Sequence, residues 1–225
     1  LDLHLKNAYI FNPEKDGNVA LILSGERQRL DMAGTMSPDY EVLQNNMYAS
    51  LLFEEQFTPS HGLSAGLSLQ RDNFTGEHVF TGGSYSAMEQ VQDMTPRETV
   101  AGVYAQYTYT LDDKLTLMAG LRADHSSLYG AFVTPRAHLR WHPTEWFTVR
   151  ASAGKGYRTP HLYPEMHHLM ANNRKWVQLG DKLPQEESWN TGTSMQFAVP
   201  LFGKNLELNV DYYYTRFMQQ LVVDR

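Results

Sequence analysis

Apolar and polar residues alternate along most of this 225-residue chain. In the segment TVAGVYAQYTYTL (99–111), Ala101 and Val103 fall on one face of an extended chain, and Gln106 and Thr108 fall on the other. A period of two is that of a β-strand with one apolar face and one polar face. Ten such runs occur, and no segment shows a helical period over about 12 residues or more. The pattern predicts an all-β protein.

The connections between the runs alternate in length. Short turns are predicted at 12–18, 58–62, 111–113, 142–145 and 200–204. Longer links are predicted at 33–43, 75–97 and 158–185, and 126–130 is a short link on the same side. An antiparallel up-and-down meander with tight turns at one end and long loops at the other is typical of outer-membrane barrels. Pro135 interrupts one run, and because proline cannot donate to a ladder, we expect a bulge or broken pairing there.

The polar faces favour a large transmembrane β-barrel over a soluble β-sandwich, whose strands also alternate. They are rich in Gly, Ser, Thr, Gln and Arg, which suits a wet lumen. Aromatic residues gather beside the short turns, where an interface girdle belongs: Phe53, Phe57, Trp141, Trp146, Phe147, Phe197 and Phe202. Ten strands taken from a larger barrel have two open edges, which must pair, curl or associate, and a smaller closed barrel is an alternative.

The composition narrows the class of protein further. A net charge of −6 and a pI near 5.8 argue against a nucleic-acid partner. The absence of cysteine excludes disulfides, thiolate metal sites and cysteine nucleophiles. No run approaches the roughly 18 apolar residues of a transmembrane helix. The first residues, LDLHLKNAYIF, lack the features of a signal peptide and already alternate, so we expect the chain to be a piece of a longer protein.

Several stretches resemble the barrel of TonB-dependent outer-membrane receptors. They are NNMYASLLFEEQFTPSHGLSAGLSL (45–69), VAGVYAQYTYTLDDKLTLMAGLRADHSS (100–127), TPRAHLRWHPTEWFTVRASAGKGYRTPHL (134–162) and LPQEESWNTGTSMQF (183–197). The most specific element is RASAGKGYRTP, a strand of small residues that ends in a Gly-aromatic-Arg-Thr-Pro step. The resemblance implies that residues 1–225 are part of the barrel domain of such a receptor, without its plug domain or signal peptide.

The resemblance also implies a function and a location. Receptors of this kind are barrels of about two dozen strands in the outer membrane of Gram-negative bacteria. They import iron–siderophore chelates, haem, cobalamin, metals or glycans, with energy from the TonB complex. The implied partners are outer-membrane lipid, the receptor's own plug domain, TonB through an N-terminal segment, a small nutrient ligand, and a surface lipoprotein as a further candidate. No resident cofactor is expected.

Two groups of candidate site residues follow. In the predicted external loop, a ligand-binding set combines histidines, methionines and aromatics: His161, Tyr163, Met166, His167, His168, Met170 and Trp176. His and Met suit copper, and His suits zinc, nickel or haem iron, but ligand contact without a metal is the preferred reading, so a metal site is left undecided. On the lumen face, plug contacts are expected at Arg122, Arg150, Gly154, Gly156 and Arg158.

The charged residues of the polar faces allow two interpretations. They could form a ladder of ion pairs along the lumen, or they could simply make a hydrated wall, which is the interpretation we prefer. The residues are Arg122, Arg136, Arg140 and Arg150 with Glu54, Asp124, Glu207 and Asp211. An enzyme is not expected, because no G-x-S-x-G or phosphate-binding loop is present and the paired acidic residues are adjacent, which turns their side chains apart on a strand. The alternative function is a soluble all-β surface module, an adhesin or a carbohydrate-binding domain.

Overall fold

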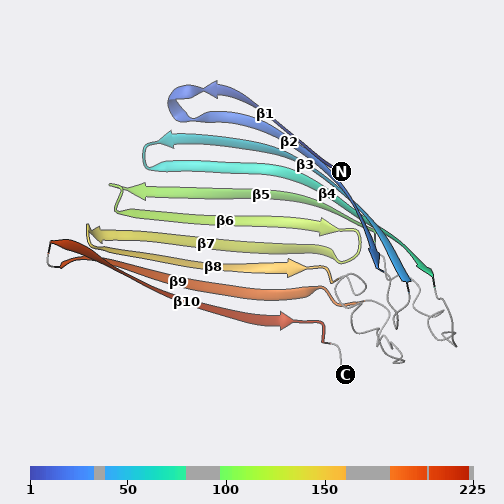
Figure 1. Ribbon diagram of the computed structural model, residues 1–225. Helices are drawn as coiled ribbons and strands as arrows, with labels where there is room; N and C mark the ends of the chain where they lie inside the picture. The colour runs from blue at the N-terminus through green and yellow to red at the C-terminus, as the bar shows by residue number, and fades with distance from the viewer. Residues whose placement is uncertain (33–38, 80–96, 161–182, 202, 223–225) are drawn as a thin grey trace.

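The fold is one antiparallel sheet of ten strands in chain order, β1 to β10. The computed structural model describes residues 1–32, 39–79, 97–160, 183–201 and 203–222 (Figure 1). The strands are β1 (Asp2–Asn12), β2 (Gly17–Met32), β3 (Asp39–Thr58), β4 (His61–Val79), β5 (Arg97–Leu111), β6 (Leu115–Ser126), β7 (Gly130–Thr144), β8 (Phe147–Arg158), β9 (Glu186–Leu201) and β10 (Lys204–Gln219). The predicted ten-strand meander is confirmed.

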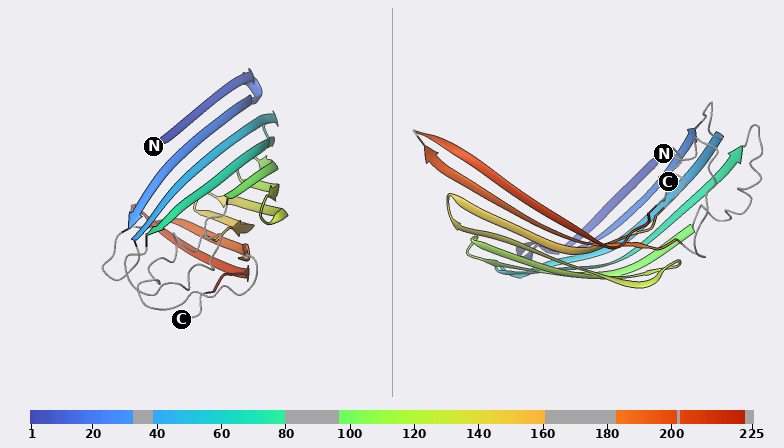
Figure 2. Two further views of the ribbon diagram at one scale, coloured as in Figure 1. Left: turned by 90° about the vertical axis from the view of Figure 1, so that its right-hand side faces the viewer. Right: turned by 90° about the horizontal axis from the view of Figure 1, so that it is seen from below.

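The sheet is strongly curved and open. Figure 2 shows it as a trough, in which β1 and β10 form the two edges. Within the described residues these two strands pair only with β2 and β9, so the smaller closed barrel weighed from the sequence is wrong for this chain. β1 begins and β10 ends at the end of the trough opposite the short turns (Figure 1).

Short turns close one end of the trough, as the sequence predicted. The turn between β1 and β2 contains a short 3-10 helix, η1 (Pro13–Lys15), followed by Asp16 with φ of 51°. The turn between β5 and β6 carries two left-handed residues, Asp112 and Asp113, with φ of 47° and 56°. Aspartate tolerates this conformation because its short side chain bonds locally, which suits a tight hairpin. We call this end the turn end and the opposite one the loop end.

Burial is inverted relative to a water-soluble sheet. Among the described residues, the buried apolar side chains are few, namely Ala20, Phe74 and Pro160, whereas the buried polar ones are Ser50, Ser68, Glu98, Asp124, Ser126 and Glu186. The apolar face lies on the convex side and stays exposed, for example along the register row of Leu21, Leu51, Leu67 and Val103. Exposed apolar area costs about 25 cal/mol per Å² in water, so this face requires lipid.

The strands extend further toward the loop end than the apolar pattern indicated. β3 begins at Asp39 and β4 continues to Val79, inside the predicted links 33–43 and 75–97. The backbone ladder continues there, with Asp39 paired to Val79, beyond the alternating runs, so hydrophobic periodicity does not mark these ends. No helix within the described ranges is long and apolar enough to cross a membrane.

The expected disturbance at Pro135 is present. The ladder between β7 and β8 begins beside the turn, where Thr144 pairs with Phe147. Its last pair toward the loop end is Arg136 with Gly154, and the next residue of β7 in that direction is Pro135. Strand β8 continues alone against β9 as far as Arg158. Proline has no N–H to donate, so the ladder toward β8 stops here, whereas the ladder between β6 and β7 continues through Pro135, which lies opposite Leu121.

Candidate functional site

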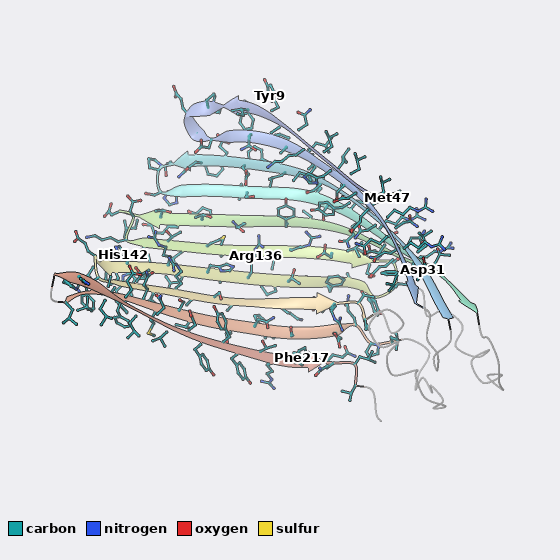
Figure 3. All side chains as sticks on the ribbon, viewed as in Figure 1. Tyr9, Asp31, Met47, Arg136, His142 and Phe217 are labelled. Carbon is teal, nitrogen blue, oxygen red and sulfur yellow. The ribbon has the colours of Figure 1, made fainter. Side chains whose placement is uncertain are left out.

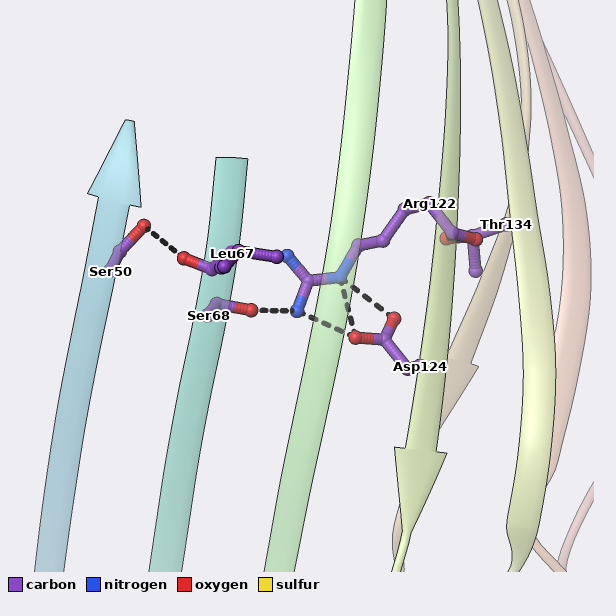
Figure 4. Close-up of polar contacts among 6 residues, drawn as sticks. All are labelled: Ser50, Leu67, Ser68, Arg122, Asp124 and Thr134. Atoms are coloured by element: carbon purple, nitrogen blue, oxygen red, sulfur yellow. Dashed lines mark hydrogen bonds and ion pairs between the residues drawn. The ribbon is translucent and has the colours of Figure 1, made fainter. Parts of the chain in front are cut away.

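The concave face of the trough carries the polar residues, and its centre is a bonded network. Arg122 Nε donates to both carboxylate oxygens of Asp124, at 2.9 and 2.7 Å, and Arg122 Nη2 donates to Ser68 Oγ at 2.7 Å (Figure 4). Ser50 Oγ donates to the carbonyl of Leu67 beside it. The side chain of Asp124 is 5% exposed, so its charge is balanced inside the wall by Arg122.

Gly102 makes room for this network. A Cβ at Gly102 would lie 2.7 Å from Arg122 Nη2 and closer still to Asp124 Oδ1. By contrast, a Cβ at Gly154 would meet Arg136 Cβ at 3.5 Å, and one at Gly156 would meet Ser188 Oγ at 4.0 Å, which are ordinary contacts. Close packing is thus found at Gly102, as it is at Gly66 and Gly192, whereas Gly154 and Gly156 leave the concave face open beside them. The plug contact expected at Gly154 and Gly156 stays a prediction.

A cationic pair lies nearer the turn end. Arg140 on β7 and Arg150 on β8 are direct cross-strand partners, both exposed on the concave face. Neither has a carboxylate partner within the described part of the chain, whereas Arg136 donates to Gln106 Oε1 at 2.6 Å. Figure 3 places Arg136 midway along β7. Like charges directly opposite one another destabilise a sheet, so this pair favours an external anion.

The arginine pair borders a hollow of about 520 Å³. Its wall also contains His138, Ser152, Ser194 and Tyr213, and no Asp or Glu contributes to it. Hydroxyl groups and an imidazole can donate hydrogen bonds to an anion beside the two guanidinium groups. The hollow can thus hold a negatively charged group that enters the trough.

A second polar cluster lies at the loop end. Glu98 at the start of β5 is 6% exposed. One of its oxygens accepts a hydrogen bond from Ser126 Oγ, and the other accepts one from Thr159 Oγ1 at 2.8 Å. Ser126 Oγ in turn accepts the backbone N–H groups of Leu128 and Tyr129. Thr159, the residue that follows β8, is therefore fixed to the start of β5.

Tyr129 responds electrostatically to this cluster. Burial raises the pKa of the Tyr129 phenol above its usual value near 10, and the negative charge of Glu98 raises it further. The tyrosine lies in the turn between β6 and β7, outside the strands. It keeps its proton at physiological pH.

The two glutamates that begin β9 turn apart, as their adjacency predicted. Glu186 accepts from Arg158 Nε at 2.7 Å and from the backbone N–H of Leu221 at 3.1 Å. Glu187 forms an ion pair of 2.7 Å with Lys155. Arg158 therefore has a carboxylate partner within the sheet, on the strand next to its own.

The predicted site residues divide into two sets. All five predicted lumen residues lie on the concave face, as their register requires: Arg122, Arg150, Gly154, Gly156 and Arg158. The seven predicted loop residues lie outside the described residues: His161, Tyr163, Met166, His167, His168, Met170 and Trp176. Within the described ranges, no group of three or more His, Asp or Glu side chains could hold a metal ion.

Comparison with known proteins identifies the family. The family model described as "TonB dependent receptor-like, beta-barrel" matches residues 3–225. The chain belongs to this family. It is therefore part of a TonB-dependent receptor barrel, located in the outer membrane of a Gram-negative bacterium.

Its relatives are transport receptors and not enzymes. An "Iron-regulated outer membrane virulence protein" of Vibrio cholerae is 25% identical over 134 residues, which cover 54% of this chain and 20% of that protein. The FrpB iron transporter of Neisseria meningitidis superposes with a TM-score of 0.62, at 16% identity, over 96% of this chain and 36% of that one.

The siderophore receptor PirA of Acinetobacter baumannii superposes with a TM-score of 0.64, at 17% identity, over 96% of this chain and 34% of that one. At these identities the structural likeness shows the fold alone. The TonB-dependent receptor chain described here spans about a third of the length of these solved relatives.

Proposed function

We propose that the chain forms part of the barrel wall of a receptor that imports a scarce nutrient across the outer membrane with energy from the TonB complex. The observation that carries the proposal is the inverted distribution of residues: exposed apolar side chains on the convex face and bonded polar side chains on the concave face. Such a wall separates lipid from a water-filled path. A soluble adhesin or carbohydrate-binding module would have to leave the same apolar face in water.

Among iron–siderophore, haem, cobalamin, metal and glycan ligands, we favour an iron chelate with negative charge. The names of the relatives refer to iron regulation, an iron transporter and a siderophore receptor. Arg140 and Arg150 support this choice, because they face the trough without a carboxylate partner among the described residues. A negatively charged chelate would be attracted along this wall and held transiently beside the hollow.

We also propose that the receptor's own plug domain contacts this concave face. The contact falls on Arg150, Gly154 and Gly156, which are accessible from the trough. Arg122 and Arg158 are committed to Asp124 and Glu186, so their plug contacts would be secondary to those pairs. Ligand capture by the loop residues His161, His167 and His168 is retained as part of the proposal, and their joint replacement by alanine with haem and metal binding as readout tests it.

The experiment uses the full-length receptor in a strain that lacks it. Growth is measured with ferric siderophores, haem, cobalamin or glycans as the limiting nutrient, and uptake of the labelled nutrient is followed. We expect growth on a ferric chelate and a clear loss of uptake in the Arg140→Gln/Arg150→Gln variant. Lys204→Gln, which removes one exposed charge at the turn between β9 and β10, is the control. Growth unaffected by loss of the receptor on every nutrient would overturn the proposal.

A further inference from the structure

Two buried glutamates bind the residues that end β8 and follow it. Arg158 Nε donates to Glu186 Oε2 at 2.7 Å, and Thr159 Oγ1 donates to Glu98 Oε2 at 2.8 Å. Glu98 is 6% exposed, Glu186 is 9% exposed, and Pro160, the next residue along the chain, is fully buried. We call Arg158, Thr159, Glu98 and Glu186 the rim clamp. Its first two members belong to the Gly-aromatic-Arg-Thr-Pro step of the sequence.

Each glutamate of the rim clamp also holds a second part of the wall. The other oxygen of Glu98 accepts a hydrogen bond from Ser126 Oγ, which in turn accepts backbone N–H groups of the turn between β6 and β7. The other oxygen of Glu186 accepts the backbone N–H of Leu221, which follows β10, at 3.1 Å. The rim clamp therefore connects the loop ends of β5, β6, β8 and β9 with the chain beyond β10.

The backbone ladders alone do not hold the end of β8 in this way. The ladder between β7 and β8 stops at Arg136 and Gly154, so the rest of β8 pairs with β9 alone within the described residues. A strand that is bonded on one side opens more easily than one bonded on both, because fewer hydrogen bonds resist the motion. The bond from Thr159 to Glu98 supplies the missing restraint on the side of β7.

The contacts of the rim clamp resist breaking because both carboxylates are buried. A buried carboxylate that loses a donor keeps the free-energy cost of its desolvation. Glu186 has the guanidinium group of Arg158 as its counter-charge, whereas Glu98 is held by two hydroxyl groups. Hydrogen bonds to an ionised group are stronger than those between neutral groups, so these contacts fix the positions of Arg158 and Thr159.

We propose that the rim clamp is a positioning device for nutrient capture, which holds the loop end of the wall from β5 to β10 in one arrangement; this inference rests on the proposed function. A binding surface that is already ordered loses less conformational freedom when its ligand binds, and its affinity is higher for that reason. Arg158 and Thr159 are positioning residues in this scheme. They raise the affinity for the nutrient through the geometry of the rim, without contact with the nutrient.

The test compares the full-length receptor with its Arg158→Met/Thr159→Val variant, which removes one donor from each glutamate. Uptake of the ferric chelate that supports receptor-dependent growth, labelled with radioactive iron, gives the half-saturation concentration and the maximal rate per folded receptor. We expect the half-saturation concentration to rise about tenfold and the maximal rate to stay within about twofold. A clamp that served stability alone would lower the amount of folded receptor without changing the half-saturation concentration.

The matched control is Lys155→Met/Glu187→Gln. It removes an ion pair of the same length, 2.7 Å, between the same two strands on the convex face, and should leave the half-saturation concentration unchanged. The conservative variants Thr159→Ser and Arg158→Lys keep a donor and should recover most of the affinity. Thr159→Val alone, with an effect of about threefold, serves if the double variant does not fold.

Hydrogen–deuterium exchange provides a second readout, which needs no nutrient. The amide of Leu221 should exchange faster in Arg158→Met, and the amide of Tyr129 should exchange faster in Thr159→Val, because each donates to a group that the clamp holds. Unchanged half-saturation in the folded double variant would overturn the inference, and so would unchanged exchange at both amides. A wild-type receptor without saturable uptake would instead contradict the proposed function, and exchange would then decide whether the clamp orders the rim.

Discussion

Thr159 donates a hydrogen bond of 2.8 Å to Glu98, although strands β6 and β7 lie between the strands from which these residues come. The two residues are 61 positions apart in the chain. Pro160, next in sequence, is fully buried. The residues that leave β8 are thereby held against the inner wall before the chain continues into 161–182.

Thr159→Val should destabilise the receptor. Removing the hydroxyl leaves a buried carboxylate oxygen of Glu98 without its donor, at a cost of about 1–3 kcal/mol. Thermal unfolding in detergent measures the change as a lower Tm. Thr159→Ser keeps the donor and should recover most of the loss, and Thr144→Val at the exposed end of β7 should have little effect. Equal Tm values for the valine and serine variants would contradict the assigned bond.

Gly102→Ala should be far more harmful than Gly154→Ala. The added Cβ at Gly102 meets the Arg122 and Asp124 side chains, whereas the one at Gly154 has ordinary contacts only. Displacing a buried ion pair leaves Asp124 incompletely compensated, which costs about 3–5 kcal/mol. The yield of folded receptor in outer-membrane fractions and its Tm are the measurements. Similar behaviour of the two variants would show that the network can shift without loss.

Stability at alkaline pH should depend on Tyr129. The pKa of its phenol is raised in the folded protein, chiefly by burial and also by Glu98. The contribution to stability is therefore complete below pH 10, the usual tyrosine value, and is lost as the pH rises through the folded-state pKa. Tyr129→Phe should reduce the alkaline fall in Tm, with no change of slope at pH 7. An identical alkaline fall in both proteins would contradict this assignment.

Arg150→Glu should raise the stability of the receptor slightly and reduce its transport of a negatively charged chelate. The substitution replaces a like-charge cross-strand pair with an ion pair to Arg140, which is worth about 0.2–1 kcal/mol in a sheet. Tm should rise slightly while uptake of a negatively charged iron chelate falls. Arg150→Gln should show an intermediate uptake. A rise in both Tm and uptake would argue that the pair has no role with an anion.

The strands and their two faces could be predicted from the sequence because each strand carries its own alternating pattern. Arg122 and Asp124 are two positions apart on one strand, so their shared face was also predictable. The contact of Glu98 with Thr159 was not, since it depends on how the chain turns after Arg158. The role of Gly102 was missed because a small residue on a polar face gives no signal until its neighbours are known.

The two glutamates of the rim clamp were not singled out from the sequence for a related reason. Glu98 and Glu186 are far apart in the chain, and only the fold brings them to Thr159 and Arg158. The histidine-rich segment after Pro160, conspicuous in the sequence, lies outside the described residues. Local composition and spatial grouping therefore pointed to different parts of the protein.

The separation of β7 from β8 beyond Pro135 has a mechanical consequence. Past Gly154 no ladder joins these two strands, and the rings of Phe132 and Tyr157, with centroids 4.6 Å apart, provide the contact instead. Side-chain contacts yield more easily than a row of backbone hydrogen bonds. The described wall is consequently easier to deform at this point, and backbone amides there should exchange with deuterium before those of the neighbouring strands.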